Sequence, residues 1–447
     1  MKINIPKEVE YIINKIEENG YEAFIVGGCV RDSLLGKIPN DFDITTNANP
    51  KTVLEIFKDE ITIPTGLKHG TITLVINKNH YEITTYRIEG TYSDNRKPDK
   101  VEYTNDLIQD LKRRDFTINA MAYNKRIGLV DKFDGKKDLK NKIIRAVGNP
   151  DERFKEDALR MLRAIRFSSQ LNFNIHKDTL NAISKNAELI NNISSERIRD
   201  EINKILVSNN SGKIYLMHKI GLLRHIILEL DEGMKTKQNN PYHIYNVGIH
   251  TLKSVKNIEP ILHLRLSMLL HDIGKVKVKT TDENGIDHFY NHAKISSEIS
   301  VEILKRLHYD NNTIEKVRLL TLYHDSKIHP NKKSIKKWLN RIGKENLDDL
   351  LKVKLADNLA KNSICHDEIK KEIKEIKEIL KKVVESNECF TIKDLAISGK
   401  DIMNLGYNQG KEIGIILNEM LEIVIDNPDL NNKDYLLNII KTKKHFL

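Results

Sequence analysis

Two aspartates separated by one residue, Asp41 and Asp43, follow shortly after a glycine-rich turn, Gly27-Gly28. A strand-like run at residues 23–26 leads into the turn, and a helical pattern separates the turn from the aspartates. Side chains two residues apart on a strand lie on the same face. Two carboxylates beside a turn that lets backbone approach a phosphate are suited to a divalent metal ion and a nucleotide. The alternative is an Asp-x-Asp on a solvent-exposed strand beside an ordinary turn, because a glycine turn alone is a weak signal.

A third carboxylate, Glu82, lies in a strand pattern at residues 81–88 and could share the face of the two aspartates. Mg²⁺ prefers one or two carboxylates plus substrate phosphates, which fits such a sparse set. Three carboxylates around two Mg²⁺ ions could activate a hydroxyl group and stabilise a leaving pyrophosphate. A solvent-facing Glu82 without a role is the alternative.

Residues 110–121 are predicted to form one helix that carries Arg113, Arg114 and Asp115 among apolar side chains. Unpaired charges there would be costly, so we expect each of them to have a partner. Arg114 could clamp a triphosphate with two parallel hydrogen bonds. The alternative is a salt bridge of Arg113 or Arg114 with Asp110 or Asp115.

Residues 156–167 are predicted to form a second helix with a polar stripe of residues spaced three apart: Asp157, Arg160, Arg163 and Arg166. Such a stripe is usually a solvated face, but one acid paired with one arginine suggests base recognition. Cytosine and adenine both present an amino group beside a ring nitrogen that accepts a hydrogen bond, whereas guanine and uracil present a carbonyl there. An Asp157–Arg160 pair could therefore admit CTP and ATP and reject GTP and UTP.

A group of histidines and aspartates lies much later in the chain. His271 and Asp272 are adjacent and flanked by leucine and isoleucine, and His250 precedes them in a probable helix. Further polar residues follow at 291–294, 323–325 and 356–358. A lone histidine is usually structural, but buried polar groups need a partner, and a metal ion is the natural one here.

The composition bounds the rest. A chain of 447 residues is long enough for about three domains or more, and its net charge of +10 favours an anionic partner unless codon bias explains the lysines. No run of about 18 apolar residues occurs, so we expect no membrane span. The cysteines Cys29, Cys365 and Cys389 have no paired spacing, which predicts a reduced, cytoplasmic protein without a structural zinc site.

The periodicity predicts an α+β multidomain fold. Strands alternate with helices up to about residue 147, in an α/β head with a small mixed or antiparallel sheet. Strand patterns occur at 23–26, 41–46, 71–76 and 81–88, and a polar loop follows at 89–104. From Pro150 onward almost every segment reads as helix. The apolar spacing at 368–383 indicates a helix that packs on its own domain rather than a coiled coil.

Taken together, the motifs resemble those of the class II tRNA nucleotidyltransferases, the bacterial CCA-adding enzymes and their poly(A) polymerase relatives. The matching segments run in family order: Gly27-Gly28 with Arg31-Asp32, Asp41-Phe42-Asp43, Gly66 to Thr71, Glu82 to Thr85, Asp94-Asn95-Arg96, Arg113 to Ala120, Glu156-Asp157 with Arg160, and the neck-like Glu196 to Ile202.

This resemblance implies roles for individual residues. Asp41 and Asp43 would hold Mg²⁺, with Glu82 as the third catalytic carboxylate. The nucleotide would be bound by Gly28 and Arg31 at its phosphates, by Asp157 and Arg160 at its base, and by Arg114, Arg163 and Arg166. The loop 89–104 resembles the flexible element implicated in the switch from C to A addition.

The histidine-rich part resembles an HD-family metal-dependent phosphohydrolase domain. The implied ligands are His250, His271, Asp272 and Asp357, with His292 and His324 nearby as further ligands or substrate contacts. Imidazole and carboxylate ligands fit Mn²⁺, Ni²⁺, Fe or Co²⁺. Because HD folds can also serve as scaffolds, the alternative is a domain without activity. Residues 397–416 resemble the C-terminal segment of HD-bearing tRNA nucleotidyltransferases.

We therefore expect template-independent addition of CCA to the tRNA acceptor arm from CTP and ATP. The expected domains are a catalytic head at 1–147, an all-α neck that binds the base and RNA at 148–235, an all-α HD domain at 240–365 and an all-α tRNA-binding tail at 366–447. The nearest alternatives are a poly(A) polymerase and an enzyme adding only CC or only A. Alternatives of other classes are an HD phosphohydrolase whose head only binds nucleotide, and an RNA-binding protein built on a decayed transferase.

Overall fold

The computed structural model describes residues 3–67, 70–90, 101–241, 243–363, 366–386 and 388–444. The chain forms two compact units, the first made of 1–231 with 306–308 and the second of 232–305 with 309–447. The first contains a large sheet and the second is almost entirely helical, which confirms the predicted α+β class. The four predicted domain boundaries stay a prediction. Asp94 and Arg96 of the polar loop lie outside the described residues.

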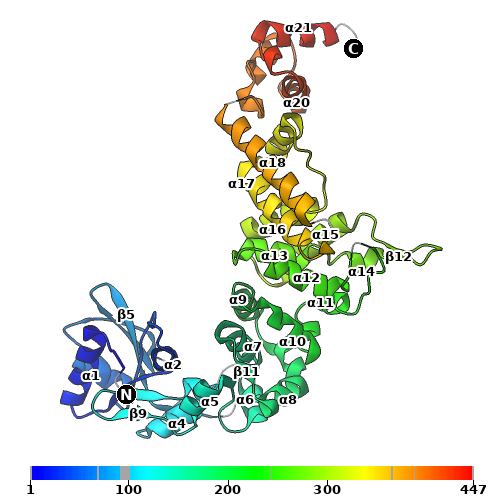
Figure 1. Ribbon diagram of the computed structural model, residues 1–447. Helices are drawn as coiled ribbons and strands as arrows, with labels where there is room; N and C mark the ends of the chain where they lie inside the picture. The colour runs from blue at the N-terminus through cyan, green and yellow to red at the C-terminus, as the bar shows by residue number, and fades with distance from the viewer. Residues whose placement is uncertain are drawn as a thin grey trace. The chain divides into compact units, whose positions relative to one another are not determined.

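The sheet of the first unit is mixed and has the strand order β3-β4-β5-β2-β1-β8-β9. Strands β2 and β5 pair in parallel, and the other neighbours are antiparallel. The strands, blue to cyan in Figure 1, are β1 (Ala23–Val26), β2 (Asp43–Thr46), β3 (Ile61–Gly66), β4 (Thr71–Ile76), β5 (Asn79–Thr85), β8 (Ala122–Asn124) and β9 (Gly128–Val130). The parallel pair is the feature that positions the carboxylates discussed below.

Two strand predictions need correction. The predicted strand 81–88 is divided, because β5 ends at Thr85 and β6 (Arg87–Glu89) leaves the sheet to pair with β7 (Val101–Tyr103). The predicted strand 41–46 begins only at Asp43. Strand β5 begins earlier than predicted because Asn77 and Lys78 both adopt left-handed backbone, at φ 51° and 66°. This two-residue turn matches the twist of the hairpin that it closes.

Helices surround the sheet of the first unit and continue beyond it. They are α1 (Lys7–Glu18), α2 (Gly28–Leu34), α3 (Pro50–Ile56), α4 (Leu107–Lys112), α5 (Gly135–Asn141), α6 (Pro150–Glu156), α7 (Leu159–Leu171), α8 (Lys177–Asn186), α9 (Ser195–Leu206), α10 (Ile214–Lys219) and α11 (Leu228–Gly233). A short parallel pair, β10 (Ile143–Ile144) and β11 (Asn174–Ile175), lies among them. Helix α7 is buried over most of its length and packs against α6, α9 and α10.

Neither of the two motif helices is continuous. Residues 110–121 form the end of α4 and a separate 3-10 turn (Thr117–Asn119), because Asp115 Oδ1 accepts a hydrogen bond from the Phe116 amide at 2.8 Å. Residues 156–167 are divided at Asp157, whose backbone is extended and whose Oδ1 accepts from the Leu159 amide at 3.1 Å. A side chain that takes up a backbone donor stops one helix and starts the next.

Among the residues described, the second unit contains ten α-helices, of which α17 is interrupted by non-helical backbone at Gly343, two short 3-10 helices (Ile392–Asp394 and Pro428–Leu430) and one short hairpin. The helices are α12 (Val247–Lys256), α13 (Leu262–Leu270), α14 (Lys275–Val278), α15 (His292–Arg306), α16 (Asn311–Tyr323), α17 (Lys332–Asn358), α18 (His366–Glu385), α19 (Gly399–Asn404), α20 (Lys411–Asp426) and α21 (Lys433–Lys444). The hairpin consists of β12 (Thr280–Thr281) and β13 (Asp287–His288). No helix within the described ranges is both long and apolar enough to cross a membrane.

Helix α18 lies along α17 and buries Ile373, Ile376, Leu380 and Val383. The helix packs on α17 of the same compact unit, although the predicted boundary at 365 places the two helices in different domains. Beyond α18, a separate apolar cluster of the tail includes Ile402, Met420 and Val424.

A crowded glycine in the head offers a test of this packing. A Cβ atom on Gly135 would lie 2.3 Å from the carbonyl oxygen of Thr117 and 2.8 Å from Met121 Cγ. We expect Gly135→Ala to force backbone movement and to destabilise the first unit by roughly 1–3 kcal/mol. Hydrogen exchange of residues 116–139 should become faster. The matched control, Gly212→Ala, adds a Cβ that meets nothing within 4 Å and should leave exchange unchanged.

Candidate active site and metal centre

The three predicted carboxylates of the head come together on the surface. Parallel pairing of β2 with β5 places Asp43 directly beside Glu82, so that both side chains lie on one face of the sheet. Asp41 lies two residues before Asp43, and all three residues are exposed. The structure therefore brings together the residues that the sequence grouped.

The electrostatics of this group suit a divalent cation. Surrounding protein withholds water from Asp43, and Asp41 and Glu82 repel its charge, which together raise the pKa of Asp43 to about 6 against the opposing effect of Arg114. Three acidic groups with one arginine near them leave a surplus of negative charge. Mg²⁺, which binds oxygen ligands, matches this set of donors.

Arg114 links the glycine turn to a buried aspartate. Its Nη2 lies 3.4 Å from Asp110 Oδ2, and its Nη1 lies 3.1 Å from the place of a Cβ on Gly27. Gly27 has φ 81°, so both backbone conformation and space favour glycine there. Arg113 also pairs with Asp110, at 2.8 Å. The alternative of a salt bridge is therefore observed, with Asp110 as the acidic partner. Arg114 still lies close enough to Asp43 to lower the pKa of that carboxyl group.

Arg31 is held rigidly behind this turn. It lies in α2, which begins at Gly28, and its side chain is buried. Nη1 donates to Asn119 Oδ1 at 2.7 Å, while Nε and Nη2 donate to the carboxylate of Asp32 at 2.9 and 2.8 Å. A guanidinium fixed in this way is preorganised for an anionic ligand.

Asp115 connects this region to helix α7. Its Oδ2 accepts from Arg163 Nε at 2.8 Å, and its Oδ1 accepts from Asn119 Nδ2 at 3.1 Å. Burial acts to raise the pKa of Asp115, but Arg163 and Asn119 outweigh it and lower the pKa to about 2. Asp115 therefore stays ionised inside the protein, which explains why a buried charge is tolerated.

Three arginines surround the ring of Phe167. The guanidinium carbons of Arg31, Arg163 and Arg166 lie 5.1, 5.5 and 4.3 Å from its centroid. Arg166 also lies 3.1 Å from Glu201 of α9. Interactions between these cations and the ring hold the like charges around one apolar surface.

Asp157 and Arg160 lie together at the start of α7 but do not pair with each other. Asp157 Oδ2 accepts from Arg197 Nη2 at 3.0 Å. Arg160 is buried and donates to Glu156 Oε2 at 2.6 Å and to the carbonyl of Arg113 at 3.0 Å. The predicted polar stripe is therefore not a solvated face, since Arg160 and Arg166 are buried.

Sequence reasoning missed several supporting residues: Asn119, Phe167, Arg197, Glu201 and the link from Asp115 to Arg163. Asp115 and Asn119 lie inside a motif that was recognised. A hydroxyl- or amide-bearing residue four positions after a buried acid is the signal that could have found Asn119.

The second group of predicted ligands lies within the second unit and is buried. His250 of α12, His271 and Asp272 at the end of α13, and Asp357 near the end of α17 converge. His250 Nε2 lies 2.9 Å from Asp357 Oδ1, 3.3 Å from His271 Nε2 and 3.4 Å from Asp272 Oδ2. His250 Nε2, His271 Nε2 and one oxygen of Asp272 lie close enough together to share one ion, and Asp357 Oδ1 lies within 3.4 Å of both histidines.

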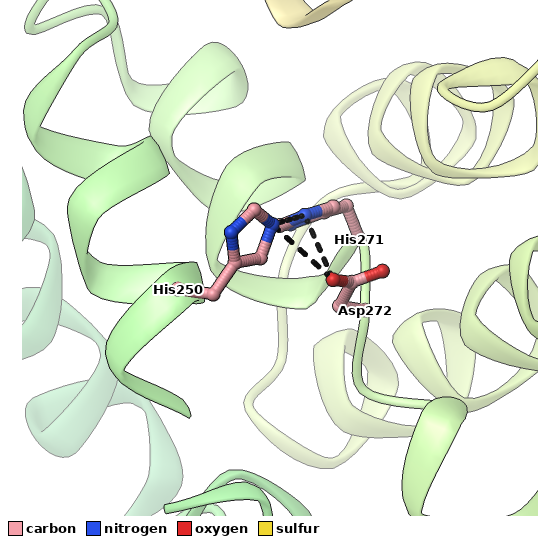
Figure 2. Close-up of side chains that lie close together, drawn as sticks. All are labelled: His250, His271 and Asp272. Carbon is pink, nitrogen blue, oxygen red and sulfur yellow. Dashed lines mark hydrogen bonds and ion pairs between the residues drawn. The ribbon is translucent and has the colours of Figure 1, made fainter. Parts of the chain in front are cut away.

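A further group shares Asp272. His292 begins α15 and His324 follows α16, and their Nε2 atoms lie 3.5 and 3.7 Å from Asp272 Oδ1. Figure 2 shows one Asp272 oxygen directed at His250 and His271, while the other points away from them. The two oxygens of one carboxylate thus serve two groups of candidate ligands.

The histidines have the hydrogen bonds typical of metal ligands. The Nδ1 atoms of His271, His292 and His324 each contact a backbone carbonyl, at 2.7, 2.8 and 2.8 Å. A carbonyl only accepts, so Nδ1 carries the proton and Nε2 faces the group.

Charge also favours a cation at this place. Burial acts to lower the pKa of His271, but Asp272 and Asp357 outweigh it and raise the pKa to about 9. Asp272 Oδ2 is buried and lies 2.8 Å from Lys275 Nζ, 3.3 Å from His271 Nε2 and 3.4 Å from His250 Nε2. These residues fit a metal ion of the kind bound by imidazole and carboxylate.

Comparison with known proteins identifies the family. Residues 23–145 match the poly A polymerase head domain, 172–234 match the RNA- and SrmB-binding site of polymerase A, and 277–440 match tRNA nucleotidyltransferase domain 2. The chain belongs to the class II tRNA nucleotidyltransferase family. This membership implies a divalent metal ion.

Among curated members of this family, the chain is 53% identical over 210 residues to the CCA-adding enzyme of Ligilactobacillus salivarius, and 50% identical over 219 residues to that of Lactobacillus johnsonii. The alignments cover 46% and 48% of this chain and 52% and 54% of the relatives. The chain thus spans about half the length of the curated relatives it matches.

Solved structures of nucleotidyltransferases match over almost the whole chain. The Bacillus stearothermophilus CCA-adding enzyme in complex with CTP is 26% identical, with 99% of both chains covered and a TM-score of 0.69. The Thermotoga maritima CCA-adding enzyme complexed with tRNA is 21% identical, with 99% of this chain and 97% of that chain covered and a TM-score of 0.60, which shows a shared fold.

The buried Asp115 predicts a pH-dependent stability. Because its folded pKa lies near 2, below the ordinary 3.8, its stabilising contribution is present above about pH 4 and is lost as the pH falls toward 2. We expect Asp115→Asn to destabilise the first unit by about 2 kcal/mol at pH 7, and the difference from wild type to shrink between pH 4 and 2. Thermal unfolding followed by circular dichroism measures this. A constant difference across that range would contradict it, and Asp200→Asn, at an exposed ion pair, is the control.

Proposed function

We propose that this protein adds CCA to the 3′ ends of tRNA from CTP and ATP without a nucleic-acid template. The observation that carries the proposal is the pairing of Asp43 with Glu82 on parallel strands, beside Asp41 and Arg114. The similarity to CCA-adding enzymes of other bacteria, one of them solved in complex with CTP, supports it.

In this reaction the 3′-oxygen of the tRNA forms a bond to the α-phosphorus of the nucleotide. The bond from that phosphorus to the pyrophosphate oxygen breaks, and pyrophosphate leaves. Asp41 and Asp43 would hold Mg²⁺, which when bound supplies activation of the hydroxyl and neutralisation of the developing charge. Glu82, in register with Asp43, completes the acidic face.

Arginines would bind the nucleotide phosphates. Arg31 is fixed by Asn119 and Asp32, and Arg114 lies beside the glycine turn at Gly27-Gly28. Arg163 and Arg166 project from α7 around Phe167. Their rigid placement reduces the entropy that is lost when a triphosphate binds.

Asp157 and Arg160 would select the base. Asp157 can accept from the amino group that cytosine and adenine share, and it would repel the carbonyl of uracil or guanine. Arg160 is tied to Glu156 and to the backbone of Arg113, so base reading requires the free face of its guanidinium.

The neck and the C-terminal tail would bind the acceptor arm of tRNA through basic residues, in keeping with the net charge of +10. The predicted boundaries at 147, 235 and 365 are part of this proposal, and so is a cytoplasmic location.

A poly(A) polymerase, or an enzyme adding only CC or only A, would use the same head residues. The Asp94–Arg96 loop that favours full CCA addition lies outside the described residues.

The second unit supports a second activity, metal-dependent phosphohydrolysis. The convergence of His250, His271, Asp272 and Asp357 is the observation that favours it. These residues would hold Mn²⁺, Ni²⁺, Fe or Co²⁺, and such an ion when bound supplies a hydroxide from water and Lewis-acid stabilisation. An inactive scaffold is the alternative.

The two activities can be separated by substitution. Asp41→Ala should reduce CTP incorporation into tRNA lacking CCA by at least about 1,000-fold, because a metal-binding carboxylate is lost, and should leave phosphate release by the second unit intact. His271→Ala should do the reverse. Single-nucleotide incorporation with radiolabelled CTP or ATP, and release of phosphate from nucleotides with Mn²⁺, measure the two reactions.

Three outcomes would count against this assignment. Normal CTP incorporation by Asp41→Ala would remove the proposed metal site, and long A tails grown from ATP alone would identify a poly(A) polymerase. No incorporation by the wild-type protein with Mg²⁺ would favour an RNA-binding protein.

Base selection predicts a specificity change. In Asp157→Ala the acceptor for the amino group is lost, so discrimination of CTP over UTP should fall by roughly 10- to 100-fold in kcat/KM. Asp178→Ala, an exposed acid in the same unit, is the control. Unchanged selectivity with normal activity would show that Asp157 does not read the base.

A further inference from the structure

Phe167 is an apolar residue surrounded by charge, and neither proposed activity gives its side chain a role. It lies in α7 and is 6% exposed. A buried aromatic ring can simply fill the interior, or it can act on the charges around it. The contacts of this ring favour the second.

The guanidinium groups over the ring come from two separate elements. Arg31 lies in α2, which follows the glycine turn, whereas Arg163 and Arg166 lie in α7. Their Cζ atoms are 4.3 to 5.5 Å from the ring centroid, within the distance of roughly 6 Å over which the negative face of a ring attracts a cation. Phe167 therefore joins the arginine behind the glycine turn to the two arginines of α7.

A second aromatic residue fixes the ring in place. Phe116 is fully buried, and its ring meets that of Phe167 edge to face, with centroids 5.7 Å apart and an interplanar angle of 81°. The amide of Phe116 donates to Asp115, the residue that also binds Arg163. Adjacent residues of the chain thus hold both the ring and the carboxylate, so the guanidinium groups surround a partner that has little freedom to move.

The arginines need such a partner because they repel one another. Burial lowers the pKa of Arg166, Glu201 opposes this effect, and the charges of Arg163 and Arg31 add to the lowering. Each of the three arginines has its own carboxylate neighbour. The ring, by contrast, contacts all three of them.

We infer that Phe167 is a positioning residue for nucleotide binding, whose ring holds Arg31, Arg163 and Arg166 where they can bind the phosphates of CTP or ATP together. The inference rests on the proposed nucleotidyl transfer and adds a residue that acts through the arginines. A leucine would fill much of the same space but has no negative face. The like charges would then spread apart before a nucleotide arrives.

Fluorinated phenylalanines at position 167 separate the charge of the ring face from the size of the ring. Fluorine withdraws electron density from the face, so monofluoro-, difluoro- and trifluorophenylalanine weaken the attraction for a cation in steps. We expect the KM for CTP and ATP to rise with each step and to reach about fivefold to tenfold in Phe167→Leu, with little change in kcat. The control is the same series at Phe173, which is similarly buried and has no cation over its ring among the described residues. It should leave the KM unchanged.

Inorganic tripolyphosphate tests the phosphates without a base or sugar. Its inhibition constant against CTP should rise across the series in step with the KM, whereas the inhibition constant of cytidine should stay constant. Equilibrium dialysis with tripolyphosphate measures the same affinity in the absence of any transfer. The KM for tRNA should not change.

The outcomes distinguish this inference from the proposed function. A KM for CTP that stays constant through the fluorinated series, with a lower unfolding temperature for Phe167→Leu, would mean that the ring only fills space and would overturn the inference. A rise in the KM for tRNA instead of CTP would also overturn it. Neither result affects the proposed transfer. Tripolyphosphate binding that weakens along the series, in a protein that incorporates no nucleotide, would support the positioning role and overturn the proposed transfer.

Discussion

A buried negative charge at Asp115 is the interaction on which the arrangement of the head depends. It joins the segment between α4 and β8 to Arg163 of α7, and through Asn119 it reaches Arg31 behind the glycine turn. A buried carboxylate without these donors would cost several kcal/mol, so the elements can pack in this way only with all the partners in place. The same contacts that make the packing possible therefore fix the guanidinium groups proposed to bind phosphate.

Contacts with one aromatic ring and with neighbouring carboxylates also hold several positive charges close together. Arg31, Arg163 and Arg166 surround Phe167, while Asp32, Asp115 and Glu201 lie beside them. Each guanidinium has five N–H donors, and the neighbouring carboxylates use only part of them. The group can therefore offer further donors to an anion without breaking the contacts that keep it in position.

Features that depend on neighbours in the chain could be predicted from the sequence, and those that depend on distant partners could not. The strand 23–26, the two-aspartate motif and the apolar face of α18 follow from local spacing. The break at Asp157 could not be predicted, because its side chain takes an amide that periodicity alone assigns to a continuous helix. The metal-ligand candidates were found as motifs. Their division around the two oxygens of Asp272 depends on how α15 and α16 pack.

The two candidate centres differ in what compensates the repulsion between their carboxylates. The head keeps Asp41, Asp43 and Glu82 at the surface, where solvent screens part of their repulsion, although the protein around Asp43 raises the pKa of that carboxyl group. In the second unit Asp272 and Asp357 are buried, so their charge must be balanced inside the protein, and Lys275, Lys361 and the protonated His271 do this.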